Sequence, residues 1–112
     1  RSRAVPFDLA LADAMREALL PGADITEKRM FGGICWMLNG NMLCGVEVGR
    51  YMFRVGADLE GEALAMEGAK PMDITGRPMR GFVWVDAKSA KGVVLTQWIA
   101  LATRFVGTLP PK

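Results

Sequence analysis

Apolar residues recur at steps of three and four from Phe7 to Leu20, which is the spacing of an amphipathic helix. Pro6 precedes this stretch and is compatible with a helix start, and Pro21-Gly22 follows it and would end a helix, so the backbone explains both predicted ends. The same spacing predicts a helix from Ser89 to about Val106 and a shorter one from Asp58 to about Glu67. The chain therefore carries three predicted helices.

Between these helices the pattern changes to short apolar runs that are separated by turn residues. The pair Asn39-Gly40 between two such runs predicts a tight hairpin, and Gly49-Arg50 predicts a second turn. Lys70 to Gly81 is rich in proline and glycine, so we expect a loop there with a short edge strand around Met72 to Ile74. Strands are expected at Ile25 to Phe31, Ile34 to Leu38, Asn41 to Val48, Tyr51 to Val55 and Phe82 to Val85.

The order of these elements is helix, strand meander, helix, strands, helix. It predicts one α+β domain over residues 1–112, with an antiparallel sheet of about five to six strands and helices packed on one face. We expect residues 1–5 to be a disordered or processed start.

The predicted hairpin at Asn39-Gly40 sets the cross-strand pairs, because a two-residue loop fixes the register. Cys35 then lies opposite Cys44, at a spacing that a disulfide can bridge. We interpret the pair as two small buried thiols, because a cytoplasmic protein keeps its thiols reduced.

Strict alternation from this hairpin divides the side chains between two faces of the sheet. The expected core face carries Cys35, Met37, Met42, Cys44, Val46, Val48, Tyr51, Phe53 and Val55. The other face carries apolar residues that need cover, so either the last helix or the loop after Gly68 folds over them, or they contact a partner or a second copy. The residues expected at such a contact are Ile34, Trp36, Leu43 and Met52.

Composition excludes several kinds of site. The chain has no histidine and two cysteines, so it lacks the side chains for a closed zinc site or a Cys-His nucleophile. No carboxylate pair is placed by local spacing for acid/base work, and we expect no enzyme activity, no cofactor and no metal. No apolar run is long enough to cross a bilayer, and a cytoplasmic location is expected.

A formal net charge of +2 does not point to a strongly basic partner-binding surface. Direct DNA contact remains an alternative if folding gathers five basic residues, Lys28, Arg29, Lys70, Arg77 and Arg80. A third hypothesis is a ligand pocket near Gly32-Gly33 and Cys35. The eight methionines are interpreted mostly as core packing.

The run KRMFGG, from Lys28 to Gly33, resembles a signature of the N-terminal domain of TfoX/Sxy proteins, bacterial regulators of competence genes. The later segments YMFRVG, GADLEGEALAMEGAKPM and FVWVD follow in the order expected for that family, and the similarity extends over about Phe7 to Phe105. Met30, Phe31, Gly32 and Gly33 are the signature residues, expected to be structural.

The resemblance implies a two-layer α+β fold, no catalysis and a role in transcription regulation. The implied partner is a protein, for example a transcription regulator such as a cyclic-AMP receptor protein, and a homodimer is also expected. Full-length members carry a further helical domain after this one, for which this sequence, ending at Lys112, leaves no room.

Overall fold

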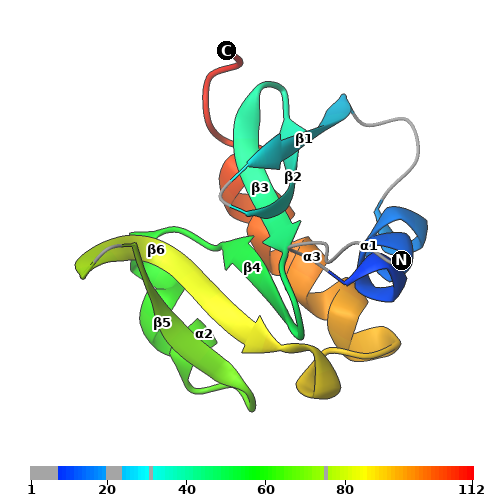
Figure 1. Ribbon diagram of the computed structural model, residues 1–112. Coiled ribbons are helices and arrows are strands. Elements are labelled where there is room, and N and C mark those ends of the chain that lie inside the picture. The colour runs from blue at the N-terminus through cyan, green and yellow to red at the C-terminus, as the bar shows by residue number, and fades with distance from the viewer. Residues whose placement is uncertain (1–7, 20–23, 31, 75) are drawn as a thin grey trace.

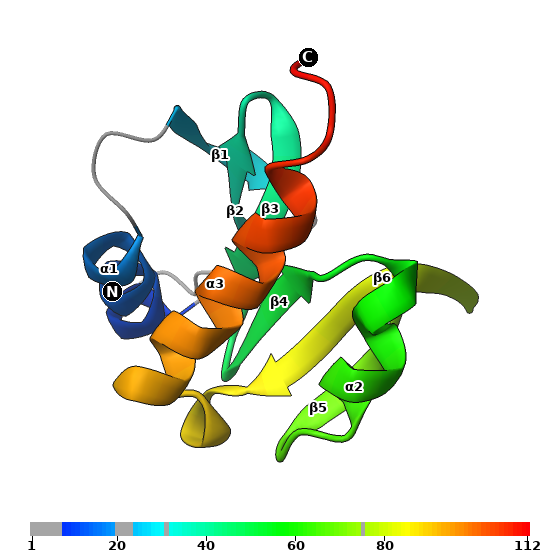
Figure 2. The ribbon, with the colours of Figure 1, turned by 180° about the vertical axis from the view of Figure 1, so that it is seen from behind.

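A computed structural model describes residues 8–19, 24–30, 32–74 and 76–112, which form a six-stranded sheet with helices on one face (Figures 1 and 2). Every pair of neighbouring strands is antiparallel, in the order β1-β2-β3-β4-β6-β5. The expected fold class is therefore confirmed. The elements are α1 (Leu9–Ala18), β1 (Ile25–Met30), β2 (Gly33–Leu38), β3 (Asn41–Val46), β4 (Arg50–Arg54), α2 (Glu60–Leu64), β5 (Ala69–Ile74), β6 (Arg77–Asp86) and α3 (Val93–Val106), with 3-10 turns at Ala57–Leu59 and Ala87–Ser89.

The helix boundaries follow from local features of the chain. Asp8 caps α1, because its side chain accepts a hydrogen bond from the Ala10 amide at 3.0 Å. The helix expected from Asp58 to Glu67 is present but shorter, as a 3-10 turn followed by α2. The predicted start of the first helix at Phe7, and residues 1–5, lie outside the described residues.

The hairpin between β2 and β3 is confirmed at Asn39-Gly40. Both residues have positive φ, 54° and 84°, which is the conformation that an Asn-Gly hairpin turn requires. The C-terminal segment packs against this hairpin: the Lys112 amide donates to the Asn39 carbonyl at 2.8 Å, and the Asn41 side chain donates to the Pro110 carbonyl at 2.9 Å.

The pairing of β2 with β3 contains a β-bulge that the sequence did not reveal. Met37 pairs with Met42 as predicted, but Trp36 pairs with Cys44, so Leu43 is an extra residue in β3. Beyond the bulge, each residue of β2 pairs with a residue one position further along β3 than expected, so Cys35 pairs with Gly45. The expected Cys35–Cys44 pair is therefore wrong, and the two thiols lie on opposite faces of the sheet as free cysteines.

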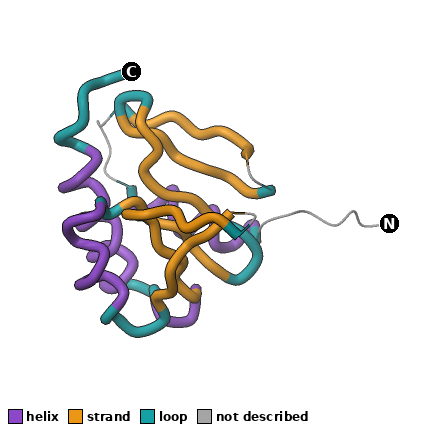
Figure 3. Tube along the Cα trace, turned by 90° about the vertical axis from the view of Figure 1, so that its left-hand side faces the viewer, coloured by secondary structure: helices purple, strands orange, loops and turns teal. Residues whose placement is uncertain are grey.

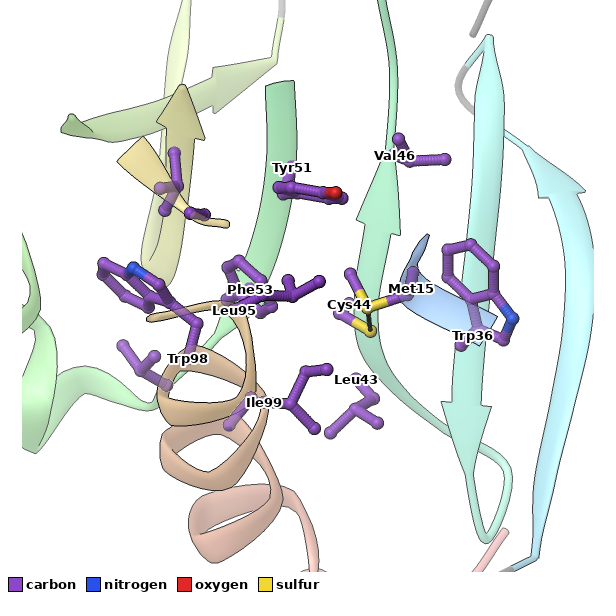
Figure 4. Close-up of a cluster of buried hydrophobic side chains, with 14 of the residues drawn as sticks. Met15, Trp36, Leu43, Cys44, Val46, Tyr51, Phe53, Leu95, Trp98 and Ile99 are labelled. Carbon is purple, nitrogen blue, oxygen red and sulfur yellow. Dashed lines mark hydrogen bonds between the residues drawn. The ribbon is translucent and has the colours of Figure 1, made fainter. Parts of the chain in front are cut away.

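The main core lies between the sheet and the helices (Figures 3 and 4). The Phe53 ring stacks on Trp98 of α3 at 5.3 Å between ring centroids, and the Cys44 sulfur lies 3.7 Å from the Met15 sulfur of α1. As predicted, Cys44 and Phe53 belong to this core. It also contains Trp36, which the predicted register had placed on the opposite face.

The segment from Lys70 to Gly81 is not a loop. It forms most of β5 and the first half of β6, so the predicted loop is wrong. The short edge strand expected around Met72 to Ile74 is confirmed, because β5 is an edge strand that contains these residues. Pro71 is tolerated because β5 is an edge strand. Pro78 lies where β6 pairs with β5, beyond the stretch of β6 that pairs with β4.

Candidate binding site on the open face of the sheet

A second apolar cluster lies on the face of the sheet that the helices do not cover. All of its members come from strands, and each of the six strands contributes at least one. We call this cluster the methionine face; it holds six of the eight methionines of the chain. Its buried members are Cys35, Met37, Met52 and Met72, and its partly exposed members are Met30, Met42, Met79, Phe82 and Trp84.

One row of cross-strand neighbours crosses the methionine face from edge to edge. Residues that pair across antiparallel strands point to the same face. The successive pairs give the row Lys28, Cys35, Gly45, Met52, Trp84 and Lys70. A lysine therefore stands at each end, and apolar or sulfur-bearing side chains lie between them.

Gly45 leaves a gap in the middle of this row. A Cβ atom at Gly45 would lie 3.2 Å from the Cys35 sulfur and 3.4 Å from the Met52 methyl carbon. The side chains of Cys35 and Met52 thus lean over the glycine from both sides. A larger residue at this position would push them apart.

The row borders a small cavity of about 20 Å³. Met30 from β1 and Met72 from β5 line it together, although β1 and β5 are the opposite edges of the sheet. The sheet is therefore curved enough to bring its edges toward each other over this face. That curvature explains how Cys35 and Met52 are almost fully buried without a helix above them. The full lining is Met30, Gly33, Cys35, Gly45, Val46, Glu47, Met52, Met72 and Trp84.

Arg50 and Glu47 form a charged pair at the rim of this cavity. The Arg50 guanidinium contacts the Glu47 carboxylate at 2.8 Å and lies 3.5 Å from the centroid of the Trp84 ring. Stacked in this way, the arginine holds the indole over the sheet. Burial, and secondarily the Glu47 carboxylate, raise the pKa of the Cys35 thiol to about 11, so the free thiol is protonated at neutral pH.

The structure does not place the expected contact residues on one surface. Ile34, Trp36 and Leu43 are 3%, 2% and 0% exposed and belong to the helix-covered core, so they cannot form a contact face in this fold. The β-bulge is the reason, because the shifted pairing places Ile34 and Trp36 on the same face of the sheet as Cys44. Met52 alone of the four lies on the methionine face. The alternative that helices cover these side chains is the one that the structure supports.

The five basic residues of the DNA alternative are also separated. Lys28 and Lys70 share the methionine face but lie on opposite edge strands. Arg29 pairs with Ile34 and so faces the helix side, while Arg80 binds the Glu60 carboxylate at 2.8 Å. Arg77, the fifth, is exposed at the start of β6. The five charges therefore do not all lie on one face of the sheet.

The signature residues have structural environments. Gly32 has a φ of 74°, and a Cβ atom at Gly33 would collide with the carbonyl group of Val46. Met30 lines the cavity, and Phe31 lies outside the described residues. The third hypothesis, a pocket near Gly32-Gly33 and Cys35, agrees in position with the cavity found here.

Sequence reasoning missed Met72, Trp84 and Met30 as parts of one site. The eight methionines are the signal in the sequence that points to such a site, although their spacing along the chain is equally compatible with core packing. Over the described ranges, no three His, Cys, Asp or Glu side chains come together to hold a metal ion. The same part of the chain contains no helix with the length and apolar character needed to span a membrane.

Comparison with known proteins identifies the family. No curated protein and no solved structure matches the chain significantly. Residues 17–106 match the family model described as the TfoX N-terminal domain, which agrees with the resemblance carried by KRMFGG and the segments after it. Since this match covers most of the chain, the protein belongs to the TfoX N-terminal domain family.

Proposed function

We propose that this domain is a non-enzymatic interaction module that binds an acidic, apolar segment of a partner protein on its methionine face. One observation carries the proposal: a cluster of partly exposed thioether and aromatic side chains lies on the face without helix cover. Apolar clusters of this kind on a sheet face are typical of contact surfaces. The residues available to a partner are Met30, Met42, Met79, Phe82 and Trp84.

The chemistry of the surface favours an adaptable apolar contact. Methionine side chains are flexible and polarisable, so they can adjust to partners of different shape. Trp84 and Phe82 add larger contact areas, and each has an arginine near its ring, Arg50 at 3.5 Å and Arg54 at 5.3 Å. Aromatic and arginine side chains are enriched among residues that dominate binding energy.

The charges around the surface favour an acidic partner. Lys28 and Lys70 are exposed at the two ends of the central row, and Arg54 lies beside Phe82. The Glu47 carboxylate on the same face is neutralised by Arg50. Complementary charge would set the orientation of the partner and speed its association. Membership of the family supports a regulatory context, in which the partner would be a transcription regulator in the cytoplasm.

The proposal can be tested with two labelled peptides of equal length and equal apolar content, one acidic and one basic. Fluorescence anisotropy should show binding of the acidic peptide, with weaker binding as salt increases. The double variant Lys28→Glu/Lys70→Glu should lose this binding. The matched control is Lys88→Glu/Lys91→Glu, which changes the same charge beside α3 and should bind as the unmodified protein does.

Other outcomes would overturn the proposal. Equal binding of both peptides, or equal loss in both double variants, would show that the charges of the methionine face do not select the partner. Binding of duplex DNA with a steep salt dependence, and no binding of either peptide, would favour the DNA alternative instead. A concentration-dependent dimer that Phe82→Ser abolishes would identify a second copy of the chain as the occupant.

A further inference from the structure

We propose that the cavity in the methionine face is a binding site for a soft monovalent metal ion, Cu(I) or Ag(I). The expected absence of a metal concerns histidine, cysteine and carboxylate ligands, whereas the thioether sulfur of methionine is a ligand for soft ions. Cu(I) prefers soft thiolate and thioether ligands. Four sulfur-bearing residues line this one cavity: Cys35, Met30, Met52 and Met72. This inference does not rest on the proposed protein partner.

The arrangement of the strands brings these four residues together at one cavity. Cys35 and Met52 are separated by Gly45 in the central row, and their side chains lean over the glycine. Adjacent strands lie about 4.8 Å apart. A side chain larger than that of glycine at position 45 would therefore keep the side chains of Cys35 and Met52 apart. The curvature of the sheet adds Met30 and Met72 from the two edge strands.

The size and polarity of the cavity suit a single desolvated ion. Its volume of about 20 Å³ is close to that needed by one water molecule. Its apolar walls leave few oxygen ligands, which disfavours hard ions such as Mg²⁺ or Ca²⁺. Cys35 would bind as the thiolate, and its proton would pass to the solvent when the ion enters. The ion retains its charge of +1 and its oxidation state.

Trp84 lines the same cavity and provides a built-in reporter. The other two tryptophans of the chain, Trp36 and Trp98, lie in the helix-covered core. A heavy soft ion held among Cys35 and the methionines would therefore quench Trp84 in preference to the other two. This selectivity distinguishes the cavity from nonspecific binding elsewhere.

The experiment is a titration of the full chain with Ag(I) in chloride-free buffer, followed by calorimetry and tryptophan fluorescence. We expect one ion per chain and quenching that Trp84→Phe largely removes. Met52→Leu and Met72→Leu conserve volume, so they should fold and yet lower the affinity by about tenfold or more each. Cys35→Ser should lower it further.

Matched controls come from the sulfur pair of the main core. Cys44 and Met15 also place a thiol near a thioether, but they lie on the other face. Cys44→Ala and Met15→Leu should bind Ag(I) as tightly as the unmodified protein, and circular dichroism should show that all the variants fold. Unchanged affinity of Met52→Leu and Met72→Leu would overturn the proposal, and so would loss of the bound ion in Cys44→Ala or the absence of stoichiometric binding.

Discussion

Gly56 offers the sharpest test of how α3 is fixed against the sheet. It follows β4 with φ 87° and ψ 154°, a conformation that is nearly restricted to glycine. Its amide donates to the Gly81 carbonyl at 3.0 Å, and a Cβ atom here would lie 2.5 Å from the nearest atom of the Phe105 ring on α3. The variant Gly56→Ala therefore combines backbone strain with a steric clash.

The size of the effect can be worked out from these two terms. The strained backbone costs about 1–3 kcal/mol, and overpacking against a ring costs about 1–3 kcal/mol more. Gly49→Ala is the matched control, because Gly49 has a φ of 76° with no atom within 4 Å of the added Cβ. It should cost about 1 kcal/mol, from the left-handed backbone alone.

Urea unfolding followed by circular dichroism measures both variants. We expect the free energy of unfolding to fall by about 2–6 kcal/mol for Gly56→Ala, which is a large part of the stability of a domain this size. The further variant Phe105→Ala should relieve the clash, so Gly56→Ala should cost less in that background. Equal losses for Gly56→Ala and Gly49→Ala, with no coupling to Phe105, would refute the claim that α3 packs tightly on this connection.

Three further predictions concern the rest of the fold. A hydrogen bond from Arg16 lowers the pKa of Glu27. The stability that the ionised Glu27 carboxylate contributes is therefore present above its unfolded-state pKa and is lost as pH falls through its lower folded-state pKa. Glu27→Gln should flatten the acid dependence of urea unfolding. Asn41→Ala removes the bond to the C-terminal segment and should cost about 1 kcal/mol, with faster amide exchange there. Mild oxidation of the folded protein should give no disulfide between Cys35 and Cys44, whereas oxidation in urea should, as mass spectrometry can show.

The local rules of the chain were sufficient for much of the fold. Asn39-Gly40 specifies its turn by backbone conformation, so the hairpin could be predicted from two residues. The helix expected from Ser89 to about Val106 is also present, as α3, because its apolar spacing depends only on residues three and four apart. Where neighbours along the chain decide the structure, the sequence was informative.

The bulge at Leu43 could not be predicted in this way. One extra residue in β3 is allowed because Leu43 and Cys44 both find space in the main core, a property of the packed helices and not of the strand. The prolines of β5 and β6 indicate a loop in the sequence for a related reason. Pro71 is tolerated in the edge strand β5 and Pro78 in the part of β6 that does not pair with β4, and neither position can be read from the sequence. The candidate site depends on both features, so it became visible only in three dimensions.

The division of sulfur between the two faces has a consequence for oxidative damage. Peroxide converts a thioether into a polar sulfoxide, which disrupts apolar packing. Met30, Met42 and Met79 are partly exposed on the methionine face, whereas Met15 in the main core is fully buried. We therefore expect oxidants to alter the open face first and to leave the aromatic core around Phe53 intact. The domain would then lose the apolar character of its methionine face, and with it the proposed contact surface, while it keeps its fold.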